Sequence, residues 1–328
     1  MPGRFARHPW SPADEGPALQ RGPSSCRRKV EAQPPDPMRA LIALLPLLTG
    51  LQEPAAPPSE GEVVTVLHPS GMKAREGRVA RGRRVGLWRG WHENGKQAYE
   101  GTYREYQREG AWRFWRPSGK LRSEGGFEAG KRSGEWIVYH ATGRKQVQGS
   151  WEQGRRVGVF LRWDRDGNPT VRHEWKDGLE HGAYVAYHPD GNKAEEGRCE
   201  LGSRIGEWTS WHANGNLERK GTYVQGEEDG EWTTYDEDGV LKARGPYVRG
   251  VQHGTWVSFH PNGTKAAEGP VVNGVQTGDY TEYWPSGDRR GQGTVANGMR
   301  EGEWVFWDRK GDVDPSLSGK YEAGKKVL

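Results

Sequence analysis

The chain has 328 residues, of which 33% are hydrophobic and 49 are glycine, and its mean hydropathy of -0.97 excludes a thick two-layer globular domain. It nevertheless carries 16 Trp and 12 Tyr, and because disordered chains are depleted in aromatic residues, we expect these rings to follow a regular pattern. The net charge is +4, with 48 basic and 44 acidic residues interleaved along the chain, so nucleic acid is not expected as a partner.

The N-terminal segment separates into a leader and an apolar run. Residues 1–37 are rich in proline and charge without apolar periodicity, which predicts a disordered leader, and we interpret it as an over-extended gene start. Met38 and an arginine then precede the twelve-residue run ALIALLPLLTGL, which predicts a signal peptide over residues 38–56 and a linker over 57–61. The run is shorter than a membrane span and contains a proline. We therefore expect an exported protein, periplasmic or extracellular. The alternative is a buried or disordered segment without a targeting role.

A glycine then recurs at intervals of 24 residues. The ten glycines are Gly86, Gly110, Gly134, Gly158, Gly182, Gly206, Gly230, Gly254, Gly278 and Gly302. A period of this size indicates a solenoid or array, which we place at residues 62–328 with about eleven units. The first unit, from Glu62, lacks the aromatic residues of the others and is interpreted as a terminal cap.

Each unit repeats the same internal pattern. With the periodic glycine as position zero, positions two and five are aromatic in all ten units, and a turn such as Asn94-Gly95 follows. A second run carries glycine at position fifteen, usually an aromatic residue at seventeen, and glycine at twenty. Asn-Gly between two β-prone runs predicts a hairpin. We therefore predict an all-β fold: an elongated single-sheet antiparallel β-meander solenoid, built from tandem 24-residue hairpin repeats and ~100 Å long at ~4.8 Å per strand.

The hairpin register decides which rings share a face. Proline at position seven of several units favours a type I turn with glycine in a bulge. That three-residue loop would place position five on one face with the glycine at fifteen and the ring at seventeen, and position two on the opposite face, partly exposed. Both ring columns are expected to pack on the sheet, and the alternative is a ladder of ring faces for a ligand. The candidate ligand or partner contacts are Trp88, Trp112, Trp136, Trp208, Trp232, Trp256 and Trp304.

The unit G-x-W-x-x-Y-x-x-N-G, followed by E-G-x-Y-x-x-G, resembles the MORN repeat variant family, found in bacterial proteins labelled as YwqK-type antitoxins. The resemblance covers residues 62–328, with departures at Tyr106, His173 and Cys199. It implies an elongated antiparallel sheet, association with proteins or membrane lipids, and no catalytic residues. An antitoxin of this type would be expected in the cytoplasm, which conflicts with the apparent export signal.

No pattern in the sequence predicts catalysis or metal binding. Histidine at position six of six units would suggest a column of metal ligands. Neighbouring units lie ~9.6 Å apart, however, whereas a zinc ligand lies within ~2.1 Å of its ion. We therefore expect these side chains to form hydrogen bonds beside turns. They are His68, His92, His140, His188, His212 and His260. Cys26 and Cys199 make no disulfide framework, and the recurrent glutamates at position fourteen are expected to form a solvated stripe. We expect no enzyme activity, no metal and no cofactor.

The function predicted from these features is that of a non-enzymatic repeat scaffold. It would mediate protein–protein interaction at the cell envelope or outside the cell, with a protein partner that the sequence does not identify. One alternative is binding of carbohydrate or cell-wall glycan through the aromatic columns. Another, from the family resemblance, is an antitoxin-like or phospholipid-associating protein, although the near-balanced charge argues against association with a membrane.

Overall fold

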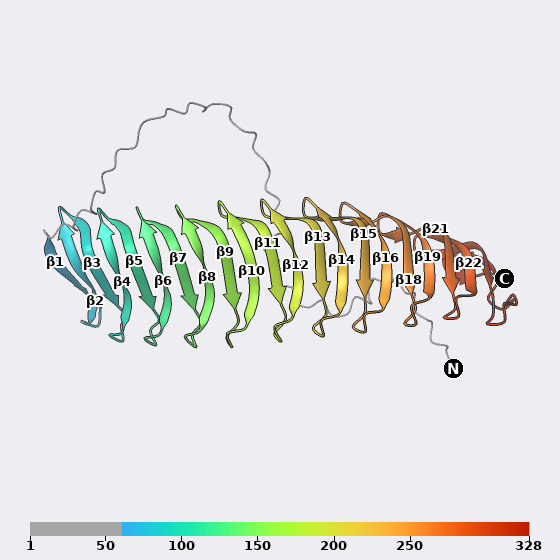
Figure 1. Cartoon of the computed structure of the whole chain (residues 1–328), viewed down its shortest axis with the longest axis horizontal. Coiled ribbons are helices and arrows are strands. Elements are labelled where there is room, and N and C mark those ends of the chain that lie inside the picture. Colours follow the sequence, from blue (N-terminus) through green and yellow to red (C-terminus); the bar gives the residue numbers. More distant parts are fainter. Residues whose placement is uncertain (1–60, 328) are drawn as a thin grey trace, which may run out of the picture. The chain divides into compact units, whose positions relative to one another are not determined.

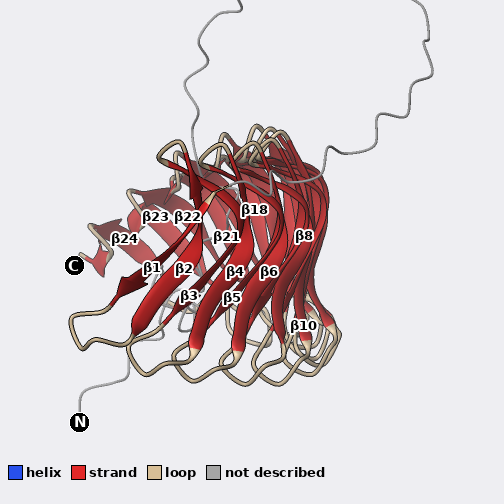
Figure 2. Ribbon diagram, turned by 90° about the vertical axis from the view of Figure 1, so that its left-hand side faces the viewer, coloured by secondary structure: helices blue, strands red, loops and turns tan. Residues whose placement is uncertain are grey.

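The computed structural model describes residues 61–327, and these residues fold as a single antiparallel sheet of sequential hairpins. The predicted all-β class is confirmed, and Figure 2 shows strands and loops alone. The predicted leader, the predicted signal peptide and most of the predicted linker lie outside the described residues. The chain divides into two compact units, and the hairpins of each follow one another in chain order (Figure 1). The N-terminal unit holds described residues up to 169 together with 174–179, and the C-terminal unit holds 170–173 and 180 onward.

The N-terminal unit contains four and a half hairpins, whose first strand, β1, pairs with β2. Its strands are β1 (Glu62–Leu67), β2 (Lys73–Ala80), β3 (Arg83–Trp91), β4 (Gln97–Arg104), β5 (Gln107–Trp115), β6 (Leu121–Glu128), β7 (Lys131–Tyr139), β8 (Lys145–Glu152) and β9 (Arg155–Trp163). The boundary between the two units runs through β10 (Pro169–Lys176).

The C-terminal unit continues the same pattern. In two of its hairpins the first strand is divided into a short and a longer strand, β17 and β18 in one and β20 and β21 in the other. Its strands are β11 (Leu179–Tyr187), β12 (Lys193–Glu200), β13 (Ser203–Trp211), β14 (Leu217–Val224), β15 (Glu227–Tyr235), β16 (Leu241–Val248), β17 (Val251–Gln252), β18 (Gly254–Phe259), β19 (Lys265–Val272), β20 (Val275–Gln276), β21 (Gly278–Tyr283), β22 (Arg289–Ala296), β23 (Met299–Phe306), β24 (Gly319–Glu322) and β25 (Lys325–Lys326).

The turn inside each repeat is the predicted type I turn with a glycine bulge. In the β3–β4 hairpin, Gly95 donates its N–H to the His92 carbonyl at 2.9 Å, and His92 donates to the Lys96 carbonyl at 2.8 Å. Gly95 has a φ of 78°, in the left-handed region that glycine adopts without steric cost. This prediction is confirmed.

A second bulge follows the turn, and it overturns the predicted faces. Trp91 pairs with Gln97, but its neighbour Gly90 pairs with Tyr99, so Ala98 has no opposite residue. One residue of the second strand is skipped at the same place in other hairpins. Examples are Ala74 between β1 and β2 and Arg122 between β5 and β6. A shift of one residue moves every side chain of a strand to the other face. The prediction that position five shares a face with the glycine at fifteen is therefore wrong, and position two takes that place.

The periodic glycine itself lies in left-handed backbone. Its φ is 64° at Gly86 and 66° at Gly206, where a side chain at Cβ would strain the chain. The turn joining one repeat to the next is also left-handed, with φ values of 50° at Arg81 and 72° at Gly82, as a two-residue type I′ turn requires. The fixed spacing of glycine thus follows from backbone geometry at three places in the repeat: the periodic glycine, the turn inside the hairpin and the turn between repeats.

The core is a layer of rings laid flat on the sheet. We call the side of the strands that bears the position-two residues the tryptophan face. Trp112 is 1% exposed and lies against Gly101, where an added Cβ would be 2.1 Å from the indole ring. Its indole N–H donates to the Thr102 carbonyl at 3.1 Å, and the ring of Tyr103 meets it edge-on with centroids 5.0 Å apart. The same packing of a position-two ring on the glycine of the repeat before it recurs in both units, as for Trp136 on Gly125 and Trp232 on Gly221.

Candidate functional site

The opposite side of the strands, which we call the position-five face, carries a column of half-buried rings. Nine of these rings end the first strand of their hairpin, and Trp307 directly follows β23. Position five is three residues after position two, so strand alternation directs its side chain to the opposite face. In the N-terminal unit the rings are Trp91, Trp115, Tyr139 and Trp163. In the C-terminal unit they are Tyr187, Trp211, Tyr235, Phe259, Tyr283 and Trp307. These rings keep part of their surface accessible to a partner.

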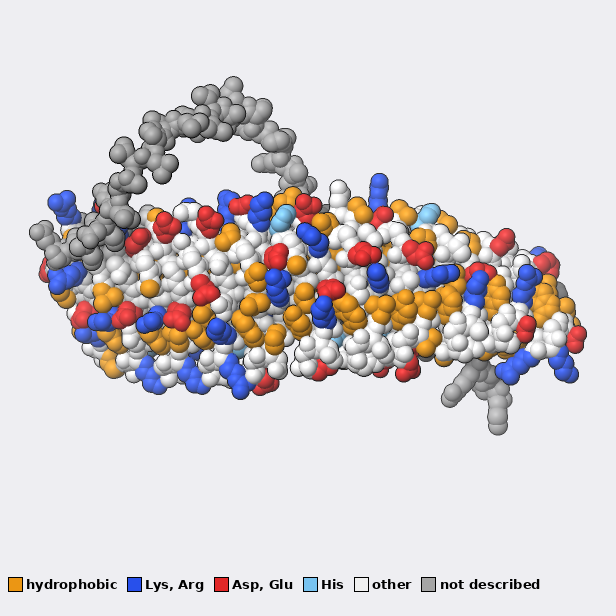
Figure 3. Space-filling model, in the orientation of Figure 1, with side chains coloured by type: hydrophobic (Ala, Val, Ile, Leu, Met, Phe, Trp, Pro, Cys, Tyr) orange, Lys and Arg blue, Asp and Glu red, His pale blue; other side chains and the backbone are white. Residues whose placement is uncertain are grey.

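Paired charges lie beside this column in both units. Arg89 is 2.7 Å from Glu100, and Lys193 is 2.6 Å from Glu196. Lysines at position eleven also lie over rings of the following repeat, as the Lys73 ammonium does at 5.1 Å from the Trp91 centroid, a distance at which a cation is attracted to the ring face. Figure 3 shows one face of the molecule, on which hydrophobic side chains form a band beside acidic and basic ones. The position-five face therefore combines apolar rings with a polar surround.

Two tyrosines of the column bind the glutamate of the preceding repeat. Tyr139 donates to Glu124 at 2.7 Å, and Tyr283 donates to Glu268 at 2.5 Å. Burial and this hydrogen bond raise the pKa of each phenol to about 12, because both disfavour the phenolate. The Glu268 carboxyl in turn has a lowered pKa, caused by hydrogen bonds from Lys265 and Tyr283. These contacts hold the rings in place at neutral pH.

The seven tryptophans predicted as ligand contacts lie in the core instead. Their exposed fractions are 1–4%, so the expectation that this column is partly exposed is wrong. The physical reason is the second bulge, which turns position two onto the glycines at position fifteen. The buried residues are Trp88, Trp112, Trp136, Trp208, Trp232, Trp256 and Trp304.

The six histidines at position six form the expected hydrogen bonds beside turns. Nε2 of His92 lies 3.0 Å from the carbonyl of Trp115, and Nε2 of His188 lies 2.7 Å from that of Trp211. Each such contact joins the turn of one hairpin to the last strand residue of the next, and the carbonyl acceptor requires the proton on Nε2. Arg116 reaches the Tyr139 carbonyl at 2.7 Å in a repeat that lacks histidine. Among residues 61–327, no group of three or more His, Cys, Asp or Glu side chains could hold a metal ion.

One repeat departs from the glycine pattern and buries a polar pair. His173 stands where other repeats have the glycine at fifteen, and the next position-two residue is the smaller ring of Tyr184. Nδ1 of His173 lies 3.1 Å from Oε1 of Glu180, and both side chains are 3% exposed. The sequence showed the lost glycine but not its partner, which lies seven residues along the chain. The pair fills the core at this position.

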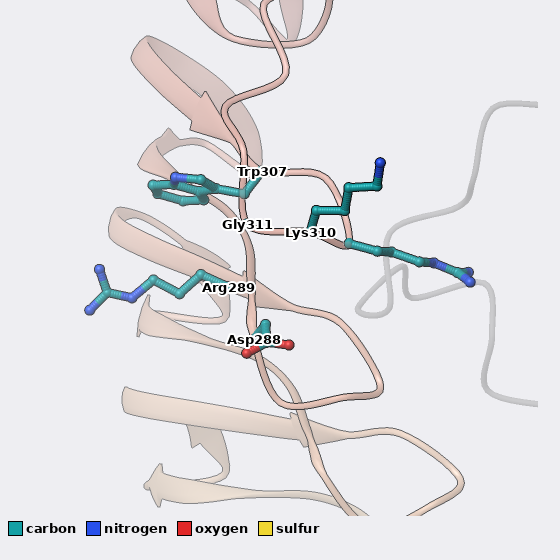
Figure 4. Close-up of a pocket in the computed structure, with 6 residues that line it drawn as sticks. Asp288, Arg289, Trp307, Lys310 and Gly311 are labelled. Atoms are coloured by element: carbon teal, nitrogen blue, oxygen red, sulfur yellow. The ribbon is translucent and has the colours of Figure 1, made fainter.

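A shallow depression lies at the last repeat. Its volume is ≈ 350 Å³, and it is lined by Asp288, Arg289, Trp307, Arg309, Lys310 and Gly311. Figure 4 shows that the side chains of Trp307 and Arg289 point to one side of the ribbon and that of Lys310 to the other. The polar groups therefore do not converge on a bound atom, as they do in a catalytic site.

Five hairpins match the sequence model of the MORN repeat variant family, at residues 84–105, 108–129, 204–225, 228–249 and 252–273. The chain belongs to the MORN repeat variant family. Each matched segment begins two residues before the periodic glycine and ends in the type I′ turn, so the MORN repeat coincides with one hairpin of the structure.

No curated protein matches this MORN repeat chain. Among solved structures it is similar to a chain in the crystal structure of TcdB2-TccC3-Cdc42, with 10% identity over 74% of this chain and a TM-score of 0.17. A chain in TcdB2-TccC3 without its hypervariable C-terminal region is similar at 11% identity over 74% of this chain, also with a TM-score of 0.17. The MORN chain spans 16% of the length of each. In the described part of the chain, no helix has the length and apolar character needed to cross a membrane.

Proposed function

We propose that this MORN repeat sheet is a non-enzymatic scaffold that binds another protein through its position-five face, at the cell envelope or outside the cell. The observation that carries the proposal is the column of half-buried rings, one per repeat, flanked by paired charges such as Arg113 and Glu124 at 3.3 Å. Protein interfaces have an aromatic centre and a polar rim, and this face supplies both in hairpins of each unit, as at Arg113–Glu124 and Lys193–Glu196.

Site-specific crosslinking tests the proposal directly. A photoreactive phenylalanine analogue is placed at Trp211 or at Tyr235 in the full chain, and adducts formed in the producing cells are identified by mass spectrometry. The matched control carries the same analogue at Leu201, a turn residue that is 66% exposed. A discrete protein adduct from the column positions, absent from the control, is expected. Adducts that are equal at all three positions, or none at any, would refute binding through this face.

Export is the second part of the proposal, and the apolar run after Met38 supports it. A fusion of residues 1–61 to a reporter enzyme that becomes active only after export tests it. Activity should require the run, so replacing two of its leucines by arginine should abolish activity. An equally active arginine variant, or an inactive fusion, would contradict export.

Carbohydrate binding is a second candidate, because rings that stay partly exposed can stack on sugars. Trp115 is the clearest place, since no described lysine lies over its ring, whereas Lys193 lies 5.8 Å from the centroid of Trp211. The full chain and the Trp115→Ala variant are mixed with peptidoglycan and common polysaccharides and sedimented. Retention that is lost with the variant would favour glycan binding. Retention that is absent or unchanged would remove it.

A further inference from the structure

The tryptophan face of the N-terminal unit carries a row of arginines. One stands two residues before each periodic glycine, and its guanidinium lies over the rings of the core. Arg84 is 4.8 Å from the Trp88 centroid, Arg108 is 4.8 Å from that of Trp112, and Arg132 is 4.4 Å from that of Trp136. Each arginine covers a ring whose other face lies on the sheet.

Further arginines add to this row. Arg122, the unpaired residue of the second bulge, lies 5.6 Å from the Phe114 centroid and is exposed. Arg162 pairs with Val147, which places it on the same face, and it is also exposed. The face therefore presents several cations to the surroundings.

No carboxylate balances the row. Between Arg83 and Pro169, every acidic residue lies in a turn or on the position-five face, where glutamates such as Glu124 pair with other arginines. Among the described residues, no ion pair reaches Arg84, Arg108 or Arg132. Burial and the neighbouring Arg108 charge lower the pKa of the Arg132 guanidinium below its ordinary value, as expected where cations lie together without counter-charges.

In the C-terminal unit, arginines of the tryptophan face form ion pairs with glutamates. Arg204, at the same repeat position, is 2.6 Å from Glu195, and Arg300 is 2.8 Å from Glu282. Other repeats of this unit have glutamate or glutamine at the position, as at Glu228, which is 3.4 Å from Arg219. The free positive row is therefore a property of the N-terminal unit and not of the repeat.

The spacing of the row fits one class of anionic partner. Successive arginines stand on strands two apart, which gives ~9.6 Å at ~4.8 Å per strand. An extended polypeptide in the polyproline II conformation advances ~3.1 Å per residue with three residues per turn, so every third side chain recurs on the same side at ~9.3 Å. Guanidinium groups bind carboxylates through two parallel hydrogen bonds. The tryptophans beneath are 1–3% exposed, so they offer no free faces on which nucleic-acid bases could stack.

We infer that the tryptophan face of the N-terminal unit binds an acidic polypeptide segment in extended conformation, lying across the strands with a carboxylate at every third residue. Arg84, Arg108 and Arg132 each receive one carboxylate. This surface lies on the opposite side of the strands from the position-five face, so it is independent of the proposed function.

Fluorescence anisotropy of the full chain with a labelled synthetic peptide tests the inference. The peptide has glutamate at every third position between prolines. One control peptide has the same number of glutamates at every fourth position, and another has lysine in place of glutamate. The first peptide should bind most tightly, the lysine peptide should not bind, and affinity should fall as salt screens the charges. Absence of binding at low salt, or equal binding of both glutamate peptides, would overturn the inference.

Two triple variants separate this face from general electrostatic attraction. Arg84→Gln, Arg108→Gln and Arg132→Gln together should weaken binding by roughly tenfold or more, because charge-assisted hydrogen bonds are lost. The matched control combines Arg83→Gln, Lys131→Gln and Arg155→Gln, which removes three charges from the opposite face of the same unit. It should change affinity less than about twofold. Equal losses in both triples would contradict a specific site.

Folding and partner class are controlled separately. If the glutamine triple fails to fold, the single variant Arg122→Gln, which removes an exposed guanidinium and keeps the stacked ones, should still weaken binding measurably; unchanged affinity would count against the inference. Competition with single-stranded RNA and with vesicles containing anionic lipid completes the test. Displacement of the peptide by either at lower concentration than by unlabelled peptide would assign the face to that other partner. Peptide binding without crosslinks at Trp211 or Tyr235 would remove the proposed function alone, and the reverse would remove this inference alone.

Discussion

The N-terminal and C-terminal units repeat the same hairpin but differ in the charge of their tryptophan faces. The first has Arg84, Arg108 and Arg132 without carboxylate partners, whereas the second pairs Arg204 with Glu195 and Arg300 with Glu282. Glycines, rings and turns are common to both. The residue two before the periodic glycine therefore tolerates either charge, because it lies above the ring layer and is not part of the backbone geometry.

The largest expected effect tests what the units share. Trp112→Ala in the N-terminal unit and Trp232→Ala in the C-terminal unit should each cost about 3–5 kcal/mol, since both indoles are nearly fully buried. Urea denaturation followed by circular dichroism measures the loss. The control Trp115→Ala, a half-buried ring of the position-five face, should cost clearly less. A larger loss for Trp115→Ala would invalidate the assignment of the faces.

A smaller effect should follow from closing the space above the position-fifteen glycines. Gly125→Ala and Gly221→Ala would place a methyl group 2.3 Å and 2.0 Å from the rings of Trp136 and Trp232. We expect each to lower stability by about 1–3 kcal/mol through overpacking, equally in both units. Thr209→Ala, on the position-five face, is the control for urea denaturation. If the glycine variants were as stable as this control, the close ring packing would be wrong.

Arginine substitutions should separate the two units. Arg204→Gln leaves the Glu195 carboxylate without its cation, and because these side chains are 11% and 22% exposed, we expect a loss of about 1–2 kcal/mol. The pKa of Arg204 lies above its ordinary value, because the Glu195 carboxylate outweighs the lowering effect of burial. Arg132→Gln should cost less, since it also relieves repulsion from Arg108.

Thermal unfolding of the two arginine variants and of the double variant Glu195→Gln, Arg204→Gln measures this difference. The double variant should recover part of the loss, because no unpaired charge remains. Equal losses of stability for Arg204→Gln and Arg132→Gln would remove the distinction between the tryptophan faces of the two units.

The smallest effect concerns the position-five face, where the units are alike. The phenols of Tyr139 and Tyr283 have pKa values raised from 10.0 to about 12, so their contribution to stability is complete below pH 10 and is lost as the pH rises towards 12. Tyr139→Phe and Tyr283→Phe should each flatten the pH dependence of the unfolding midpoint in this window by a similar small amount. A flattening in only one of the variants would show that the two units differ on this face as well.

Much of the fold followed from particular residues. The Asn94-Gly95 pair predicted the turn, and the periodic glycines predicted the number and spacing of the hairpins, because each must adopt left-handed backbone. The candidate site did not follow. The residue skipped in the second bulge is alanine at 98, arginine at 122 and glutamate at 218, so no residue type marks the bulge. The arginine row was visible as a recurrence, but its meaning depended on where the glutamates lie.

The sequence by itself determined the 24-residue hairpin, its turn and the family, because these depend on local backbone conformation at glycines such as Gly86 and Gly95. Only the tertiary structure decided which rings are buried. One skipped residue such as Ala98 moves the following side chains of the strand to the opposite face of the sheet. The tertiary structure also decided which charges are paired. Glu195 is nine residues from Arg204 and meets it across two neighbouring strands, whereas Arg108 has no such neighbour, and a contact across strands exists only once the register is set.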